Sequence, residues 1–293
     1  MALSSDKQVS PARAVDAAGG SVSGRTGGAV GDRRWLSIVG IGEDGVAGLG
    51  EAAREAISGA AHVFGGRRHL ALADDLIRGE AHPWPVPFDP SMADVVALKG
   101  QQVCVLASGD PFHYGVGVSL ARVIGPDQMI CHPVPSSFAL AAARLGWALQ
   151  AVDCLSLHVA PVASLRRFLH PGRNLLILTS GARGPADIAG YLVAGGFGTS
   201  TISVLEALGG PDEQIRSCRA AEFDLPDVHP LNVVALQVAV DGEGARVLPL
   251  SAGLPEDWFG HDGQITKRDV RALTLAALAP RPGELLWDIG AGS

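Results

Sequence analysis

The stretch "WLSIVGIG", residues Trp35–Gly42, sets the pattern of the fold, because a short apolar run ends in closely spaced glycines. A run of this length bounded by glycines predicts a buried strand followed by a loop. The same pattern returns in "QVCVLASGDP", Gln102–Pro111. Between these two stretches, "LGEAAREAISGAAHVFGG" (Leu49–Gly66) predicts a helix followed by a further strand.

Strands and helices keep alternating along the next hundred residues. Ser136–Trp147 begins with two possible N-cap serines and continues as an Ala/Leu helix. Asn174–Gly181, Ser200–Gly210 and Leu231–Val240 are apolar or β-branched runs typical of buried strands. This alternation predicts an α/β protein, in which ligands sit beyond the carboxyl ends of the strands.

The two ends of the chain differ from this pattern. Residues 1–32 are rich in Ala, Gly and Ser without periodicity, which predicts a disordered leader; an expression remnant or an over-long start is the alternative. Residues 246–265 read as a Pro/Gly-containing linker. Thr266–Pro280 predicts a helix, and "GELLWDIGAGS" (Gly283–Ser293) predicts a strand that meets a glycine loop.

Composition restricts the function classes. The net charge of −7 argues against general nucleic-acid binding but leaves room for a local basic pocket. The longest apolar runs have strand length, far below the roughly 20 residues of a membrane helix, and no secretory signal is apparent. The four cysteines form no CxxC pair, which argues against a zinc site and a disulfide framework. We expect a reduced, cytoplasmic protein.

The glycine-rich loop "VGIGEDG", Val39–Gly45, is a weak signal on its own. Its glycines fit the letters of GxGxxG, but Glu43 and Asp44 place negative charge where a pyrophosphate would lie. This argues against a dinucleotide, and a structural turn is the favoured interpretation of the loop alone.

The loop "ASGDPFHYGVG", Ala107–Gly117, is more specific. Gly109 permits close backbone approach, Asp110 can hold a loop or a ligand, and Pro111 stiffens the turn. A plain type I turn is the alternative. The hydroxyls of "HPVPSSF" (His132–Phe138) and "TSG" (Thr179–Gly181) are more often helix caps than ligand contacts.

A basic cluster follows two glycines in "GGRRHL", Gly65–Leu70. A solvated loop is the default interpretation, although arginines also grip carboxylates with paired hydrogen bonds. His158 in "SLH" is most simply a structural histidine. Neither a Ser/His/Asp set nor a metal-ligand spacing stands out, so the sequence predicts no metal site.

Taken together, "VGIGEDG", "ASGDPFHYG", "PVPSS" and "EALGGPDEQIR" resemble the tetrapyrrole methylases in order and spacing over roughly residues 34–243. "GGRRHL" and "SLH" resemble the branch that methylates precorrin-6Y or its cobalt analogue. The resemblance implies two α/β subdomains, here 33–132 and 133–245, with the active site in the cleft between them. It also implies S-adenosyl-L-methionine as cofactor and a homodimer.

The resemblance also implies site residues. Many relatives have Pro-Gly where this chain has Glu43-Asp44. The implied base comes from an unranked group of four, Asp110, His113, Glu43 and His158. The implied substrate contacts, for the carboxylates of a corrin precursor, are Arg67, Arg68 and His69. The implied cofactor contacts are Gly42, Ser108, Gly109, Asp110, His113, Ser136, Ser137, Ser180, Leu208 and Asn232.

Residues 256–293 are similar to the start of a second, Rossmann-like methyltransferase domain, so 266–293 are expected to be its truncated beginning, with the rest of that domain as a missing partner. Fused enzymes of the family methylate C5 and C15 and decarboxylate, with C5 assigned to the first domain. Two alternatives remain open: another enzyme of this fold, such as uroporphyrinogen-III methyltransferase or diphthine synthase, and a corrin carrier without turnover. The vestigial second site would comprise Thr266, Gly290, Ala291, Gly292 and Ser293.

Overall fold

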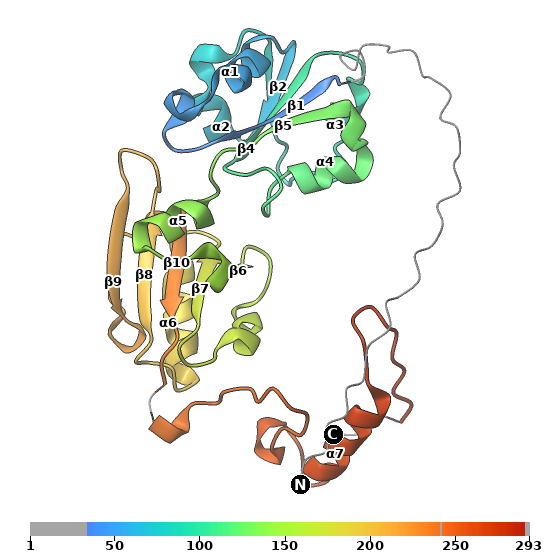
Figure 1. Ribbon diagram of the computed structural model, residues 1–293, viewed down its shortest axis with the longest axis vertical. Helices are drawn as coiled ribbons and strands as arrows, with labels where there is room; N and C mark the ends of the chain where they lie inside the picture. The colour runs from blue at the N-terminus through green and yellow to red at the C-terminus, as the bar shows by residue number, and fades with distance from the viewer. Residues whose placement is uncertain (1–33, 241, 291–293) are drawn as a thin grey trace, which may run out of the picture.

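A computed structural model describes residues 34–240 and 242–290, and its core consists of two five-stranded sheets (Figure 1). The first sheet has the order β3-β2-β4-β1-β5, and all its strand pairs are parallel. Parallel strands need crossover helices, which explains the predicted alternation. Its strands are β1 (Leu36–Ile41), β2 (His62–Gly65), β3 (Glu80–Pro83), β4 (Val103–Ser108) and β5 (Met129–His132).

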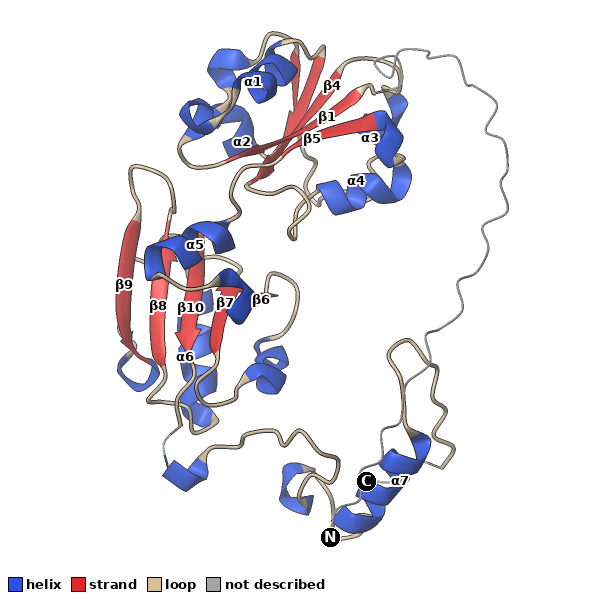
Figure 2. Cartoon of the chain, in the orientation of Figure 1, coloured by secondary structure: helices blue, strands red, loops and turns tan. Residues whose placement is uncertain are grey.

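Helices cover both faces of this sheet (Figure 2). Ile57 of α1 packs with Val39 and Leu106 on one face, whereas Leu120 of α4 packs with Ile38 and Val105 on the other. Because successive strand residues point to opposite faces, a strand covered on both sides must be apolar throughout. The helices are α1 (Glu51–Ser58), α2 (Arg67–Leu72), α3 (Ala93–Ala97) and α4 (Gly117–Val123).

The second sheet is mixed, with the order β6-β7-β10-β8-β9. Only β6 and β7 run parallel; the other three pairs are antiparallel. Helix α5 covers the face that carries Leu205 and Val233, and α6 covers the opposite face. The elements are β6 (Asp153–Ser156), β7 (Asn174–Leu178), β8 (Thr201–Glu206), β9 (Gln214–Arg219), β10 (Asn232–Gln237), α5 (Ser137–Leu145) and α6 (Gly184–Ala194).

Helix α7 (Arg268–Leu278) and the residues that follow it lie apart from both sheets in Figures 1 and 2. The predicted helix is present as α7 (Arg268–Leu278). Before it, the ring of Trp258 makes cation–π contacts with the guanidinium groups of Arg166 and Arg246. The predicted strand is wrong for described residues 283–290, which form no strand. Trp287 is 74% exposed there, and without a neighbouring strand its backbone has nothing to pair with.

The predicted leader, residues 1–32, lies entirely outside the described residues. So do three residues of the predicted vestigial site, Ala291, Gly292 and Ser293. Thr266 and Gly290 are described, and both are exposed. Within residues 34–240 and 242–290, no helix combines the length and the apolar character needed to cross a membrane.

Candidate active site

A cavity of about 410 Å³ lies between the two sheets and is lined by residues from both. From the first sheet come the loops after β1 and β4, at the carboxyl ends of parallel strands; the second sheet contributes the ends of β7, β8 and β10. Most residues singled out from the sequence meet here. Those that line the cavity are Gly42, Glu43, Arg68, His69, Ser108, Gly109, His113, Ser136, Ser137, His158, Leu208 and Asn232.

Three of the residues predicted for the first methyltransferase site lie outside this lining. Asp110 turns its carboxylate back onto its own loop and accepts a hydrogen bond from the backbone N–H of Phe112 at 2.9 Å. Arg67 is exposed on α2, and Ser180 lines an adjacent hollow beside α6. Their side chains therefore lie away from the cavity even though their neighbours in the chain line it.

Two glycines bring the loops after β1 and β4 together. A Cβ added at Gly40 would lie 1.8 Å from the carbonyl oxygen of Gly109, a distance that no side chain can occupy. Gly109 has φ +56°, and its N–H donates to the carbonyl of Ile41 at 3.3 Å. Glycine is the residue that adopts this backbone region without steric cost. The first wall of the cavity thus depends on backbone contact rather than on side chains.

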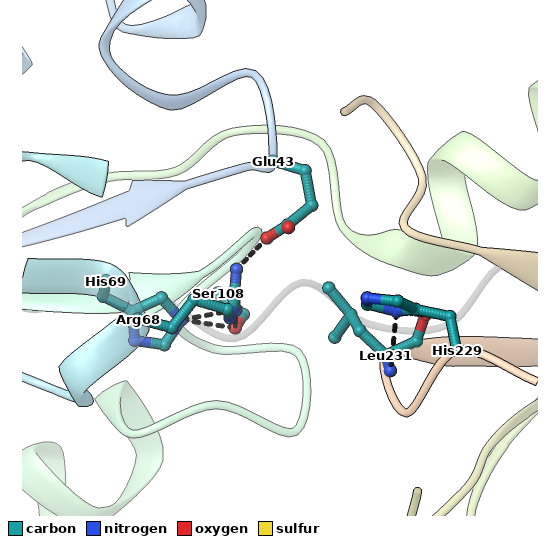
Figure 3. Close-up of polar contacts among 6 residues, drawn as sticks. All are labelled: Glu43, Arg68, His69, Ser108, His229 and Leu231. Atoms are coloured by element: carbon teal, nitrogen blue, oxygen red, sulfur yellow. Dashed lines mark hydrogen bonds and ion pairs between the residues drawn. The ribbon is translucent and has the colours of Figure 1, made fainter. Parts of the chain in front are cut away.

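A polar network joins α2 to both of these loops (Figure 3). Arg68 Nη1 forms an ion pair with Glu43, and Arg68 Nη2 donates to Ser108 Oγ at 2.9 Å. Ser108 Oγ lies 2.7 Å from His69 Nε2, so the hydroxyl can donate to the imidazole while accepting from the guanidinium. The network fixes Arg68 between an acid and a hydroxyl at the cavity wall.

His69 is the neutral member of this network. Burial, together with the adjacent Arg68 charge, lowers the pKa of His69 to about 4. With Nε2 accepting, the ring proton is assigned to Nδ1, which is buried and has no hydrogen-bond partner among the described residues. Near neutral pH, His69 therefore presents an uncharged ring to the cavity.

The opposite wall is held by a buried amide. Asn232 at the start of β10 accepts from Thr179 Oγ1 at 2.7 Å and donates to the carbonyls of Gly181 and His229 at 3.2 and 2.8 Å. Two of the partners follow β7 and the third precedes β10, so the side chain of Asn232 joins the loop after β7 to the loop before β10. Figure 3 shows the His229–Leu231 turn across from Arg68.

A second anchor holds the same loop. Glu206 at the end of β8 is 2% exposed, and its carboxylate receives Arg216 Nε at 2.8 Å and Nη2 at 3.0 Å. It also accepts the backbone N–H of His229 at 2.6 Å. A buried carboxylate with three donors is well satisfied.

Two histidines of the predicted base group face the cavity differently. His158 Nδ1 lies 3.4 Å from the carbonyl oxygen of Thr179; because a carbonyl only accepts, Nδ1 donates there, and in a neutral imidazole Nε2 then keeps its lone pair. His113 is instead enclosed by aromatic rings, 4.8 Å from the ring of Phe138 and 5.4 Å from that of Tyr114.

Sequence reasoning missed several lining residues. Tyr114 has φ +59°, an uncommon conformation for a non-glycine residue, and its hydroxyl donates to the carbonyl of Cys154 at 3.1 Å. This bond links the loop after β4 to the second sheet. Tyr114 lies within the motif "DPFHYG" (Asp110–Gly115), and its place in that motif is the sequence signal that could have identified it. The other missed lining residues include Trp84, Leu140, Ser156, Thr179, Gly181, Pro230 and Leu231.

Comparison with known families gives two matches. The profile of the tetrapyrrole (corrin/porphyrin) methylases matches residues 36–224, and that of a precorrin methyltransferase domain matches residues 257–293. The first match spans both sheets up to the loop after β9. The second includes α7 and the segment that follows it.

Individual proteins are also similar. Precorrin-6Y C(5,15)-methyltransferase [decarboxylating] from Sinorhizobium sp is 58% identical over 259 residues, 88% of this chain but 62% of that protein. Cobalt-precorrin-7 C(5)-methyltransferase from Salmonella typhimurium is 31% identical over 180 residues, 61% of this chain and 88% of that protein. The chain thus spans under two thirds of the first relative.

The fold has solved counterparts. The crystal structure of uroporphyrin-III C-methyltransferase from Thermus thermophilus, complexed with S-adenyl homocysteine, superimposes with a TM-score of 0.52 at 19% identity. The superposition covers 69% of this chain and 91% of the other. At this identity the similarity establishes the two-sheet fold alone.

Proposed function

The chain belongs to the tetrapyrrole (corrin/porphyrin) methylase family, and we propose that it methylates a carbon of precorrin-6Y using S-adenosyl-L-methionine. The observation that carries this proposal is the cavity between the sheets, where the loops of the family motifs meet. The relatives named for precorrin methylation support the substrate class.

The lining residues fit the cofactor chemically. Apolar side chains of Leu140 and Leu208 suit the faces of an adenine, while the hydroxyls of Ser136 and Ser137 and the Gly109 backbone offer hydrogen bonds to polar groups. When bound, S-adenosyl-L-methionine supplies a methyl group on a cationic sulfur. Gly42, Ser108, His113 and Asn232 would complete the site, with Asn232 acting through the loops that it joins.

The part of the cavity that would bind the corrin precursor needs cationic side chains to pair with the carboxylates of that substrate. We propose that Arg68 contributes but is partly neutralised by Glu43, which leaves its remaining N–H groups for a substrate carboxylate. His69 would act as an uncharged donor or acceptor. Arg67, exposed and outside the cavity, would contribute at most to long-range attraction.

Among the four proposed bases, we rank His158 first. It lines the cavity, is exposed to it, and has Nδ1 against a carbonyl, so Nε2 can accept a proton from the macrocycle. Glu43 is held by Arg68, Asp110 caps its own loop, and His113 is packed between rings. The protein's other contribution is to orient the carbon nucleophile and keep water out.

We propose C5 as the methylated position, because a relative named for C5 matches over most of its own length. The segment matching a precorrin methyltransferase domain would belong to a separate C15-methylating, decarboxylating unit. A cytoplasmic homodimer is proposed from the family resemblance; light scattering at micromolar concentration tests the dimer.

Mass spectrometry after incubation with S-adenosyl-L-methionine and a panel of tetrapyrroles tests the function. We expect precorrin-6Y to gain one methyl group with all carboxyls retained, and uroporphyrinogen-III to remain unchanged. His158→Ala should lower kcat at least about 100-fold with S-adenosylhomocysteine affinity preserved. Carbon dioxide release, two added methyls, or methylation of uroporphyrinogen-III instead would contradict the proposal.

A further inference from the structure

At the edge of the first sheet, three side chains that play no part in the cavity converge. Strands β2 and β3 are parallel and pair His62 with Glu80 and Phe64 with His82. Because side chains two residues apart in a strand share a face, His82 lies on the same face as Glu80, beside His62. The strand register thus brings two imidazoles and a carboxylate together, although β3 begins 18 positions after β2 in the sequence.

The ligand atoms face one another at short range. His62 Nδ1 lies 3.0 Å from His82 Nε2, and each of these nitrogens lies 3.7 Å from Glu80 Oε2. A triangle with these sides has a centre roughly 2.0 Å from all three atoms, which is the length of a zinc–nitrogen or zinc–carboxylate bond. An ion at this centre, or slightly above it, would contact all three without rearrangement of the backbone.

Neighbouring residues orient both imidazoles. His62 Nε2 lies 3.1 Å from Gln101 Oε1, and an amide oxygen can only accept, so Nε2 donates there and, in the neutral ring, Nδ1 presents its lone pair inward. The ring of His82 stacks on Phe64, with centroids 4.5 Å apart and planes 17° from parallel. A partner on the distal nitrogen, as His62 has, is typical of metal-binding histidines, and the stacking on Phe64 fixes the plane of the His82 ring.

Exposure leaves room for a further ligand. The side chains of His62 and His82 are 18% and 27% exposed, whereas that of Glu80 is 69% exposed. The imidazoles are therefore held by the sheet, and the carboxylate borders solvent that can supply a water molecule. Two nitrogens, one oxygen and a water are a donor set suited to Zn²⁺ and less suited to Mg²⁺ or Ca²⁺, which prefer oxygen ligands.

We propose that His62, Glu80 and His82 form a binding site for a divalent transition metal ion of the zinc type. The bound ion ties edge strand β3 to β2. The site does not depend on the proposed methyl transfer, because none of its three residues lines the cavity.

Titration of the tag-free full chain with Co²⁺, followed by displacement with Zn²⁺, tests the proposal. We expect one equivalent of Co²⁺ to give visible d–d bands of a four- or five-coordinate ion. His62→Ala should abolish these bands, and Glu80→Gln should weaken Zn²⁺ binding by roughly 10-fold or more. Gln101→Leu should weaken it by roughly 10–100-fold, because the histidine loses the partner that fixes its tautomer.

Two control residues away from the cluster separate the site from general metal binding. Glu55→Gln on α1 and His170→Ala in the second half should leave affinity unchanged. At free Zn²⁺ about 100-fold above Kd, Tm should rise by roughly 5–10 °C in the wild type and not in His62→Ala. Equal Zn²⁺ affinity in wild type, His62→Ala and Glu80→Gln, or a thiolate charge-transfer band with Co²⁺, would overturn the site.

Discussion

Arg68 and Glu43 form an ion pair that joins the start of α2 to the loop after β1. The side chains are 38% and 19% exposed, so the pair is half-buried at the cavity wall. A glutamate considered as a base and an arginine considered as a carboxylate clamp thus offset each other's charge. The cavity wall proposed to face the substrate is therefore less positive than the sequence "GGRRHL" alone indicates.

The two arginines of this sequence should behave differently on substitution. Arg68→Ala removes a cation from the cavity and should raise KM for the tetrapyrrole by roughly 10–100-fold, because a charge-assisted hydrogen bond contributes about 1.5–3 kcal/mol. Arg67→Ala is the matched control and should change KM less than about twofold. Steady-state kinetics with saturating cofactor measures both. Equal effects of the two substitutions would contradict the assignment of Arg68 alone to the cavity.

The pH dependence of the free energy of unfolding should reveal the lowered pKa of His69. Its pKa is lowered from 6.5 to about 4 in the folded protein, so between these values the unfolded chain binds a proton that the folded chain does not. The contribution to stability is present above pH 6.5 and is lost as pH falls towards 4, by about 2 kcal/mol at pH 4.5.

His69→Gln should remove this contribution while keeping an acceptor for Ser108. Urea unfolding at pH 7 and pH 4.5 then gives a smaller stability difference for the variant than for the wild type, by about 2 kcal/mol. His170→Gln, outside the cavity, is the control. If His69→Gln and the wild type lose the same stability on acidification, His69 is not held neutral by the fold.

The sequence predicted the buried strands of both sheets because they are continuous apolar runs bounded by glycines. It did not predict the shorter or more polar strands β3, β5, β6 and β9. In β9, which lies at a sheet edge, half-buried residues alternate with exposed ones, so no apolar run marks the strand. Neither could it place Asp110 outside the cavity, since that depends on whether a carboxylate turns toward its own backbone. The His62–Glu80–His82 cluster depends on strand register, which no local spacing encodes.

Gly40 should be intolerant of any side chain. In Gly40→Ala the new Cβ would lie 1.8 Å from the Gly109 carbonyl oxygen, so the loops after β1 and β4 must separate. We expect a loss of stability of about 3 kcal/mol or more and at least about tenfold weaker S-adenosylhomocysteine binding by calorimetry.

A glycine in open space provides the contrast. Gly190 lies inside α6, and a Cβ there meets nothing within 4 Å. Gly190→Ala should therefore raise stability by about 0.5–1 kcal/mol through helix propensity and leave ligand binding unchanged. Similar behaviour of the two variants would show that the Gly40–Gly109 contact does not hold the cavity wall.

The buried Glu206–Arg216 pair should matter more for stability than a surface pair. Glu206→Gln leaves Arg216 without its carboxylate and weakens the hold on His229, and should cost about 3 kcal/mol in urea unfolding. Asp187→Asn, which breaks the exposed Arg183–Asp187 pair, should cost less than about 0.5 kcal/mol. Comparable costs would mean that the loop before β10 is anchored by other contacts.

Two substitutions of Asp110 distinguish a role in holding its loop from a role as an acid or base. Its carboxylate oxygen accepts the N–H of Phe112 at 2.9 Å, and an asparagine oxygen can accept the same bond. Asp110→Asn should therefore keep kcat and S-adenosylhomocysteine affinity within about threefold. Asp110→Ala cannot make the bond and should weaken cofactor binding by roughly fivefold, because the bond contributes about 1 kcal/mol. Single-turnover rates with precorrin-6Y measure the chemical step. A loss of more than about 100-fold in Asp110→Asn, with cofactor binding intact, would move the base from His158 to Asp110.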